Sequence, residues 1–162
     1  MVSARAVAET VTDPELPMLT LAELGVLRDV TERTGRVEVT ITPTYTGCPA
    51  LDTMRADLRS RLAAAGYPEV EIRTVLDPPW TTDWITESGR RKLSEAGMAP
   101  PGPAPRREPG PIPLTLGPAR RVRCPRCGSA DTVELSRFGA TACKSLRRCD
   151  ACREPFEHFK EL

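Results

Sequence analysis

The chain has 162 residues, with 23 basic and 22 acidic side chains and a formal net charge of +1. This balance argues against a protein whose whole surface is built to bind nucleic acid or anionic lipid. No stretch approaches the roughly 18 apolar residues of a membrane span, and the N-terminus lacks the apolar segment of a signal peptide, so we expect a cytoplasmic protein. In that reducing compartment, the six cysteines are better explained as metal ligands or reactive thiols than as a disulfide framework.

Proline divides the chain into modules. Eight of the 19 residues from Pro100 to Pro118 are proline, which lacks an amide donor and fixes φ, so we expect an extended spacer there. Residues 1–99 carry 11 basic and 15 acidic side chains, whereas residues 119–162 carry 10 basic and 6 acidic ones. The sequence therefore predicts an acidic module over 1–99, a proline-rich linker over 100–118 and a basic module over 119–162.

Hydrophobic periodicity predicts six elements in the first module. In chain order they are a short helix over 2–11, strands over 24–31 and 36–42 joined as a hairpin, a helix over 50–65, a strand over 69–75 and a helix over 81–97. The order α-β-β-α-β-α predicts a small domain of the α+β or α/β class. Its helices are expected to pack against a mostly antiparallel sheet.

Two of these helices have a predicted buried face. In the helix over 50–65, an apolar stripe lies opposite three arginines and Gly66 supplies the C-terminal stop. The stripe consists of Leu51, Met54, Leu58 and Leu62. In the N-terminal helix, the face expected to be buried consists of Val2, Ala6, Val7, Thr10 and Val11.

One cysteine precedes the helix over 50–65. Cys48 stands between Gly47 and Pro49, and proline favours the first helical position, so the thiol is expected at or beside the N-cap. The free amides and the helix dipole there favour a thiolate, which is a better nucleophile and a better ligand for a soft metal. A small buried apolar residue is the other reading of Cys48. Because a single thiol cannot hold a metal by itself, a chemical role implies a transient ligand or a helper group.

Three residues are candidate helpers for Cys48. They are Asp13 and Glu15 in the stretch "TDPELP", and Thr46. A carboxylate in an Asp-Pro turn also serves to cap local backbone, so both readings of Asp13 stay open. A Cys-His catalytic pair is not favoured, since the only histidine, His158, lies beyond the linker.

The second module contains two C-x-x-C pairs separated by 21 residues. The four cysteines are Cys124, Cys127, Cys149 and Cys152. Two such knuckles form a tetrahedral site of the structural zinc type, and four protein ligands leave no open position for a substrate. The residues between and after them fit a hairpin and a third strand, so the module is predicted to be a small all-β zinc ribbon that depends on metal for much of its folding energy.

Further residues of this module leave alternatives open. Cys143 is a buried strand residue, a substitute ligand or part of an iron–sulfur site. His158 is interpreted as a surface or packing residue, since four thiolates already suffice. Arginines and phenylalanines are interspersed, as in a nucleic-acid-binding ribbon. The preferred reading of this modest basic excess is docking to an acidic protein surface or to no partner at all.

The quoted motifs resemble a known family. "DPELP" with "LAELGVL", followed by "TGCPALDTM", is similar to the MIP18 family (formerly DUF59), whose members assist iron–sulfur cluster assembly and carry a reactive cysteine in the same G-C-P setting. "DPPWTTDWITESGRRKLSEAGMAPP" and the terminal ribbon resemble the PaaD branch, also called PaaJ, which comprises accessory components of the multicomponent oxygenase that epoxidises phenylacetyl-CoA.

The resemblance implies a MIP18-type domain with a reactive Cys48, an appended zinc ribbon, and two partners: a diiron oxygenase and its flavin and iron–sulfur reductase. It implies a role in loading or repairing their iron or clusters, with Cys48 as a transient ligand of an iron ion or iron–sulfur cluster. The chain itself is expected not to be an enzyme, because one histidine cannot supply two Glu-x-x-His pairs and no G-x-G-x-x-G is present. A structural or regulatory subunit of the same complex and a nucleic-acid-binding ribbon are the alternatives.

Overall fold

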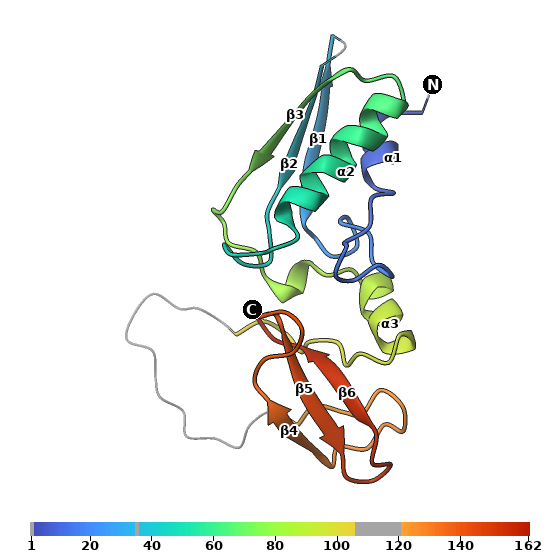
Figure 1. Ribbon diagram of the computed structural model, residues 1–162, viewed down its shortest axis with the longest axis vertical. Coiled ribbons are helices and arrows are strands. Elements are labelled where there is room, and N and C mark those ends of the chain that lie inside the picture. Colours follow the sequence, from blue (N-terminus) through green and yellow to red (C-terminus); the bar gives the residue numbers. More distant parts are fainter. Residues whose placement is uncertain (1, 35, 106–120) are drawn as a thin grey trace. The chain divides into compact units, whose positions relative to one another are not determined.

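A computed structural model describes residues 2–34, 36–105 and 121–162. The chain separates into two compact units, Met1–Lys92 and Leu93–Leu162 (Figure 1). Most of the predicted linker, residues 106–118, lies outside the described residues, so the extended spacer stays a prediction. In the described part, no helix is both long and apolar enough to cross a membrane.

The first unit has the predicted order of elements. They are α1 (Ala4–Ala8), β1 (Leu27–Arg33), β2 (Arg36–Ile41), α2 (Leu51–Ala64), β3 (Glu69–Thr74), the 3-10 helix η1 (Thr82–Trp84) and α3 (Glu87–Glu95), whose last turn extends into the second unit. The sheet has the order β1-β2-β3. This confirms the predicted α-β-β-α-β-α arrangement.

The sheet is mixed rather than mostly antiparallel. β1 and β2 form the expected antiparallel hairpin, with Val30 opposite Val39. β2 and β3 run parallel, with Val39 opposite Ile72. The reason is α2, which returns the chain to the starting end of the sheet between the two strands, as a crossover between parallel strands requires.

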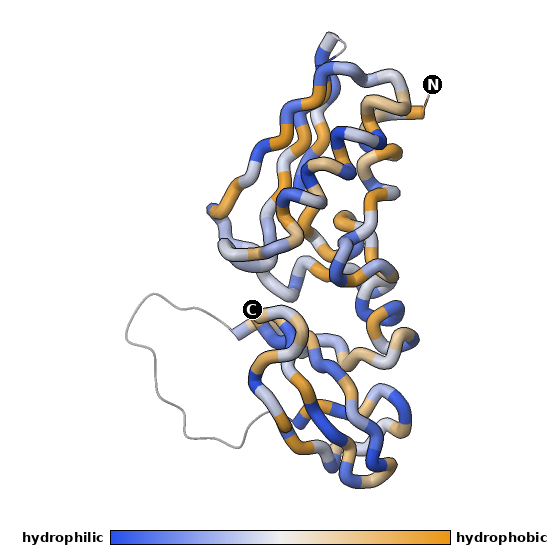
Figure 2. Tube along the Cα trace, in the orientation of Figure 1, coloured by the Kyte–Doolittle hydropathy of each residue, from blue (hydrophilic) through white to orange (hydrophobic). Residues whose placement is uncertain are grey.

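One face of this sheet is covered and the other is exposed. Val37, Val39 and Ile41 of β2 are fully buried, and α1 and α2 pack against the sheet (Figure 1). The alternate positions carry an ion-pair network, in which Arg73 binds Glu71 at 3.1 Å and Glu38 at 3.2 Å. Figure 2 shows the matching alternation of hydrophobic and hydrophilic residues along these strands. The alternation of apolar and charged residues therefore decides which face of the sheet packs against the helices.

The buried face of α2 agrees with prediction, whereas that of α1 does not. Met54, Leu58 and Leu62 are buried in α2 and Leu51, the first residue of the predicted stripe, is half-buried. Gly66 ends the helix at φ +96°. In α1 the buried residues are Ala4 and Ala8. Of the predicted face, Val11 is buried beyond the end of α1, whereas Val2, Ala6 and Thr10 are exposed, so the face predicted for the helix itself was wrong. A helix of five residues spans barely more than one turn, so neighbouring structure, here α2 and β1, decides which side faces inward.

The last predicted helix of the first module is divided in two. Thr81 accepts a hydrogen bond from the amide of Asp83 (3.4 Å) and begins η1. Ile85 is extended, and the Thr86 hydroxyl then accepts from the amide of Gly89 (3.0 Å) at the start of α3. Two threonine caps within six residues favour two short helices over one continuous helix.

The second unit is a three-stranded antiparallel sheet. Its strands are β4 (Thr132–Ser136), β5 (Lys144–Cys149) and β6 (Pro155–Phe159), in that order. Ala99 extends the sheet beside β6, because its amide donates to Glu157 (2.8 Å) and its carbonyl accepts from Phe159 (3.0 Å). The structure accordingly divides the chain between Lys92 and Leu93, earlier than the composition suggested, since backbone pairing and not proline content assigns Ala99 to the ribbon.

Candidate functional site

Cys48 lies in the loop that connects β2 to α2. Its amide donates to the carbonyl of Tyr45 (3.2 Å), and its carbonyl accepts from the amide of Leu51 (3.3 Å). Ala50 is the N-cap of α2, so Cys48 stands two residues before the cap and α2 begins later than expected. The side chain is half-buried. A half-exposed thiol just before a helix start is accessible to a metal or a partner while its backbone is held by a turn.

The loop of Cys48 emerges from the same end of the sheet as the segment that leads into β1. The amide of Thr42 donates to the carbonyl of Val26 (2.9 Å), which ties the end of β2 to the residue before β1. Figure 1 shows both segments at this end of the first unit. The fold therefore brings the residues around Val26 and Thr42 to one end of the sheet.

The candidate helpers differ in their surroundings. Asp13 is buried, and its Oδ1 accepts from the amides of Glu15 (2.7 Å) and Leu16 (3.0 Å). This is the local backbone cap that an Asp-Pro turn favours. Glu15 and Thr46 are exposed. Asp13 thus stabilises its own turn. Its role as a helper of Cys48 stays a prediction.

Four cysteines of the ribbon converge. The sulfurs of Cys124, Cys127, Cys149 and Cys152 all lie within 4.8 Å of one another. Sγ of Cys124 is 3.7 Å from Sγ of Cys152, and Sγ of Cys127 is 3.5 Å from Sγ of Cys149. A tetrahedron with metal–sulfur bonds near 2.3 Å has edges of about 3.8 Å. The donor set and its spacing therefore fit a four-coordinate thiolate site.

Backbone hydrogen bonds shape the first knuckle. The amide of Cys124 donates to the carbonyl of Ser129, and the amide of Gly128 donates to the carbonyl of Cys124, both at 2.9 Å. Gly128 has φ +75°, a left-handed conformation that glycine adopts without strain. This turn places the two thiols of the first pair on one side of the chain.

The second knuckle repeats the same bonds. The amide of Cys149 donates to Glu154 (3.0 Å), and the amide of Arg153 donates to Cys149 (2.9 Å). Arg153 has φ +67° where the first knuckle has glycine. The sequence analysis did not identify this strained position, although the common spacing of Gly128 and Arg153 from the first cysteine of each pair could have revealed it.

The second knuckle favours an ionised sulfur at Cys149, whereas the pKa values of the Cys127 and Cys152 thiols are raised. The amide of Cys152 donates to Sγ of Cys149 at 3.5 Å. This hydrogen bond lowers the pKa of the Cys149 thiol to about 7. Thiolate is the form that binds metal.

Cys143 and His158 lie elsewhere in the ribbon. Cys143 is buried, and its sulfur is 3.0 Å from the Thr141 hydroxyl. His158 is buried in β6, with Nδ1 3.4 Å from the Ser145 hydroxyl. Neither residue belongs to the group of converging sulfurs. Both positions suit packing within the ribbon.

Comparisons with known proteins agree with these two units. Residues 4–78 match the family model "Iron-sulfur cluster assembly protein", and residues 108–160 match "PaaD zinc beta ribbon domain". A crystal structure of a DUF59 domain from Bacillus anthracis superimposes with a TM-score of 0.51 and 29% identity, covering 56% of this chain and 87% of that one. Fold and site thus define an iron–sulfur-assembly-type domain joined to a zinc ribbon.

Full-length similarity assigns the family. The chain is 43% identical over 155 residues, 96% of this chain and 89% of the relative, to an Escherichia coli (strain K12) protein that is provisionally named as a subunit of 1,2-phenylacetyl-CoA epoxidase. It is 34% identical over 86 residues, 52% of this chain and 81% of the relative, to an Fe-S protein maturation auxiliary factor of Porphyromonas gingivalis. The chain therefore belongs to the PaaD family, which joins a DUF59 (MIP18) domain to a zinc ribbon.

Proposed function

We propose that the chain is an accessory subunit of the phenylacetyl-CoA 1,2-epoxidase system that assists iron or iron–sulfur loading or repair. The half-exposed Cys48 thiol before α2, in the unit that matches iron–sulfur cluster assembly proteins, is the observation that carries this proposal. The recipients are a diiron oxygenase and its flavin and iron–sulfur reductase. The place of action is the cytoplasm, where thiols stay reduced.

Cys48 acts as a transient ligand of the iron or cluster that is transferred. Binding replaces one ligand of the cargo by the sulfur, and the thiol proton leaves with the displaced ligand or to solvent. One protein thiolate holds such cargo only briefly, which suits transfer better than storage. Backbone hydrogen bonds with Tyr45 and Leu51 hold the main chain of Cys48 in a turn during this exchange.

The ribbon cysteines bind a structural zinc ion in this proposal. Cys124, Cys127, Cys149 and Cys152 would hold it, and the ion would supply a folded scaffold and no reaction chemistry, because four protein ligands leave no open coordination position. The sulfur spacing reported above is the supporting observation. Cys143 is assigned a packing role.

The test compares two cysteine substitutions in the full chain. The epoxidase components are produced with wild type, Cys48→Ser or Cys143→Ser, and the iron content of the purified oxygenase and reductase and phenylacetyl-CoA epoxidation are measured. We expect Cys48→Ser to lower both to the level seen without this chain. Cys143→Ser removes a thiol outside the loop and is expected to retain both. Full metal content and full epoxidation with Cys48→Ser would contradict the proposal.

A structural or regulatory subunit is the second candidate, favoured by the pairing of a closed four-thiol site with full-length similarity to an epoxidase subunit. It predicts that Cys48 is dispensable and that Cys124→Ser abolishes co-purification with the epoxidase. If Cys48 transfers iron, Cys48→Ser instead lowers the iron content of the oxygenase and reductase.

A further inference from the structure

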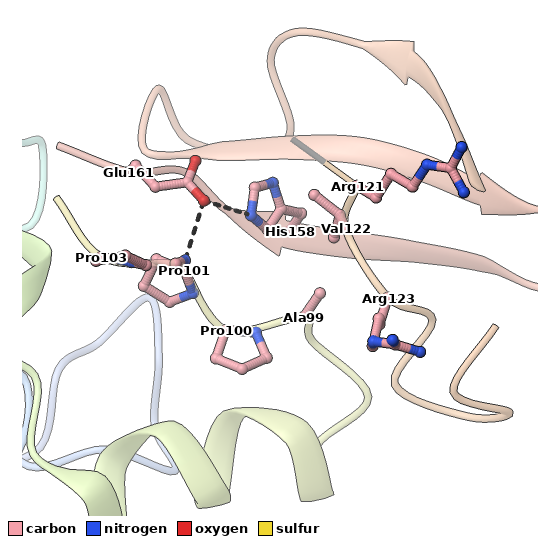
Figure 3. A pocket seen from close by; sticks show the side chains of 10 residues that line it. Ala99, Pro100, Pro101, Pro103, Arg121, Val122, Arg123, His158 and Glu161 are labelled. Atoms are coloured by element: carbon pink, nitrogen blue, oxygen red, sulfur yellow. Dashed lines mark hydrogen bonds and ion pairs between the residues drawn. The ribbon is translucent and has the colours of Figure 1, made fainter. Parts of the chain in front are cut away.

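One face of the ribbon is hollowed around His158 and Glu161. Two adjoining cavities of about 370 and 340 Å³ have Val122, His158 and Glu161 in common. Figure 3 shows the first, where His158 and Glu161 face the segment from Ala99 to Pro103. We call the two cavities together the ribbon hollow. Each has the size of a site for a few side chains of a ligand.

Cations dominate the wall of the ribbon hollow. They are Arg121, Arg123, Arg137, Arg147 and Lys160. The wall carboxylates already have donors: Glu134 lies 3.4 Å from Arg147, and Glu161 accepts from the amide of Gly102 at 3.0 Å. Burial lowers the pKa of His158, so the imidazole adds no charge near neutral pH. In Figure 3 the Arg121 side chain points away from His158, and Arg123 donates to the carbonyl of Gly128 (3.0 Å). The positive excess of the hollow therefore comes from Arg137, Arg147 and Lys160.

Arg147 has unused hydrogen-bonding capacity in this wall. Its side chain is 12% exposed, and its contact with Glu134 is long for a hydrogen bond at 3.4 Å. Among the described residues, its buried Nε has no hydrogen-bond partner. A guanidinium offers five N–H donors and binds a carboxylate in a bidentate manner. Such a group is well suited to an incoming carboxylate.

Lys160 and Arg137 add charge beside Arg147. Nζ of Lys160 donates to the carbonyl of Arg137 at 3.1 Å and lies 4.7 Å from the ring centre of Phe138. Neither cation forms an ion pair within the described ranges of the chain. Both are therefore available to an acidic ligand.

We propose that the ribbon hollow binds an acidic, extended peptide segment of a partner protein. The inference rests on the proposed function, which requires the chain to dock on the protein that receives iron. A peptide is the occupant favoured over nucleic acid because the proposed function requires a protein partner, and because the cations of the wall complement carboxylate side chains. The prolines at 100, 101 and 103 form a stiff side wall.

The test uses fluorescein-labelled octaglutamate as the probe and the zinc-loaded full chain as the receptor. Binding is followed by fluorescence anisotropy at about 0.15 M salt, where long-range attraction between exposed charges is largely screened. We expect saturable binding that Arg137→Gln weakens by roughly threefold to tenfold, because it removes one cation that contacts the ligand. Amide signals of Val122, Arg137 and Lys160 should shift in nitrogen–proton spectra.

Arg126→Gln is the matched control. Arg126 is also exposed and in the ribbon, and its ion pair with Glu154 is loose at 3.8 Å. It lies outside the hollow, so this substitution changes the net charge equally and should leave the octaglutamate affinity within twofold. Equal loss in both variants would mean unspecific attraction and overturn the proposal. Tighter, Arg137-dependent binding of a 20-nucleotide single strand would overturn it in favour of nucleic acid.

The outcomes also separate this inference from the proposed function. Cys48→Ser should bind octaglutamate as wild type does while failing in iron loading. If Arg137→Gln binds octaglutamate normally but Cys48→Ser fails in iron loading, the proposed peptide site is wrong and the proposed function stands. If Arg137→Gln weakens octaglutamate binding but Cys48→Ser supports full iron loading, the proposed peptide site is supported and the proposed role of Cys48 is wrong.

Discussion

The unit Met1–Lys92 and the unit Leu93–Leu162 differ in what fills their interiors. In the first, large aliphatic side chains from helices, strands and loops are fully buried. They include Leu19, Leu21, Leu24, Ile41, Met54, Leu58 and Leu62. The second unit buries Leu93, Met98 and Phe159. It also has a core cluster of Ala99, Cys124, Cys149 and Phe156, two of whose four members are metal-ligand candidates.

This difference indicates two sources of stability in one chain. Burial of a leucine-sized side chain contributes about 1.5–3 kcal/mol, and the first unit has many such residues. A ribbon of this size has too little apolar area and relies on bound metal. The first unit is thus expected to fold without metal and the second to require it.

Metal removal should produce the largest effect and act on the ribbon alone. Structural zinc sites contribute about 10–16 kcal/mol of apparent binding free energy in zinc-finger peptides. We expect a chelator, or Cys149→Ser, to collapse the amide signals of β4 to β6 while those of β1 to β3 stay dispersed. Nitrogen–proton spectra before and after chelation check this. A ribbon that stays folded without metal would contradict the inference that the two units differ in their source of stability.

A cavity in the core of the first unit tests the same comparison from the other side, because it should destabilise the first unit and not the ribbon. Leu58→Ala removes a fully buried side chain of α2 and should lower the free energy of unfolding of the first unit by about 2–5 kcal/mol. Leu76→Ala is the control, because Leu76 is 49% exposed and its loss should cost under about 0.5 kcal/mol. Denaturant unfolding followed by signals of each unit measures both. Equal destabilisation of the ribbon by Leu58→Ala would show that the units unfold together.

A carboxylate makes the stability of the first unit depend on pH. Burial alone would raise the pKa of Glu23, but hydrogen bonds from Lys92, Thr20 and Ser88 outweigh it and hold the pKa below its ordinary value of 4.5. A lowered folded-state pKa means stability that is present above pH 4.5 and is lost as pH falls through the folded value. Glu23→Gln should flatten the pH dependence of unfolding in this acidic window and leave the slope above it unchanged. An identical acid limb in both proteins would contradict this role.

The smallest expected effect is a stabilisation of the ribbon. Arg153 adopts φ +67°, which is unfavourable for a residue with Cβ, so Arg153→Gly should relieve strain of about 1 kcal/mol, partly offset by the greater entropy of glycine in the unfolded chain. Zinc affinity or thermal unfolding of the ribbon measures the gain. Gly128→Ala at φ +75° is the matched substitution and should destabilise. A loss of stability in Arg153→Gly would show that its side chain has a stronger role than its backbone strain.

Local patterns predicted the elements well, and contacts between distant residues explain the deviations. The alternation of Val37, Val39 and Ile41 and the stripe of Met54, Leu58 and Leu62 were read correctly because each pattern is set by the geometry of one element. The buried face of α1 was misread, since one turn of helix has no periodicity of its own. The parallel pairing of β2 with β3 and the pairing of Ala99 with β6 involve partners that no local window contains.

The sequence by itself determined the four-cysteine spacing, the two modules and the G-C-P setting of Cys48, because each depends on residues close together in the chain. Only the tertiary structure decided that Asp13 caps its own turn, that Cys143 lies outside the thiol cluster, and that cations from separate segments line one hollow. Those properties depend on which surfaces meet when the chain folds, and packing of distant segments sets that, not the order of neighbouring residues.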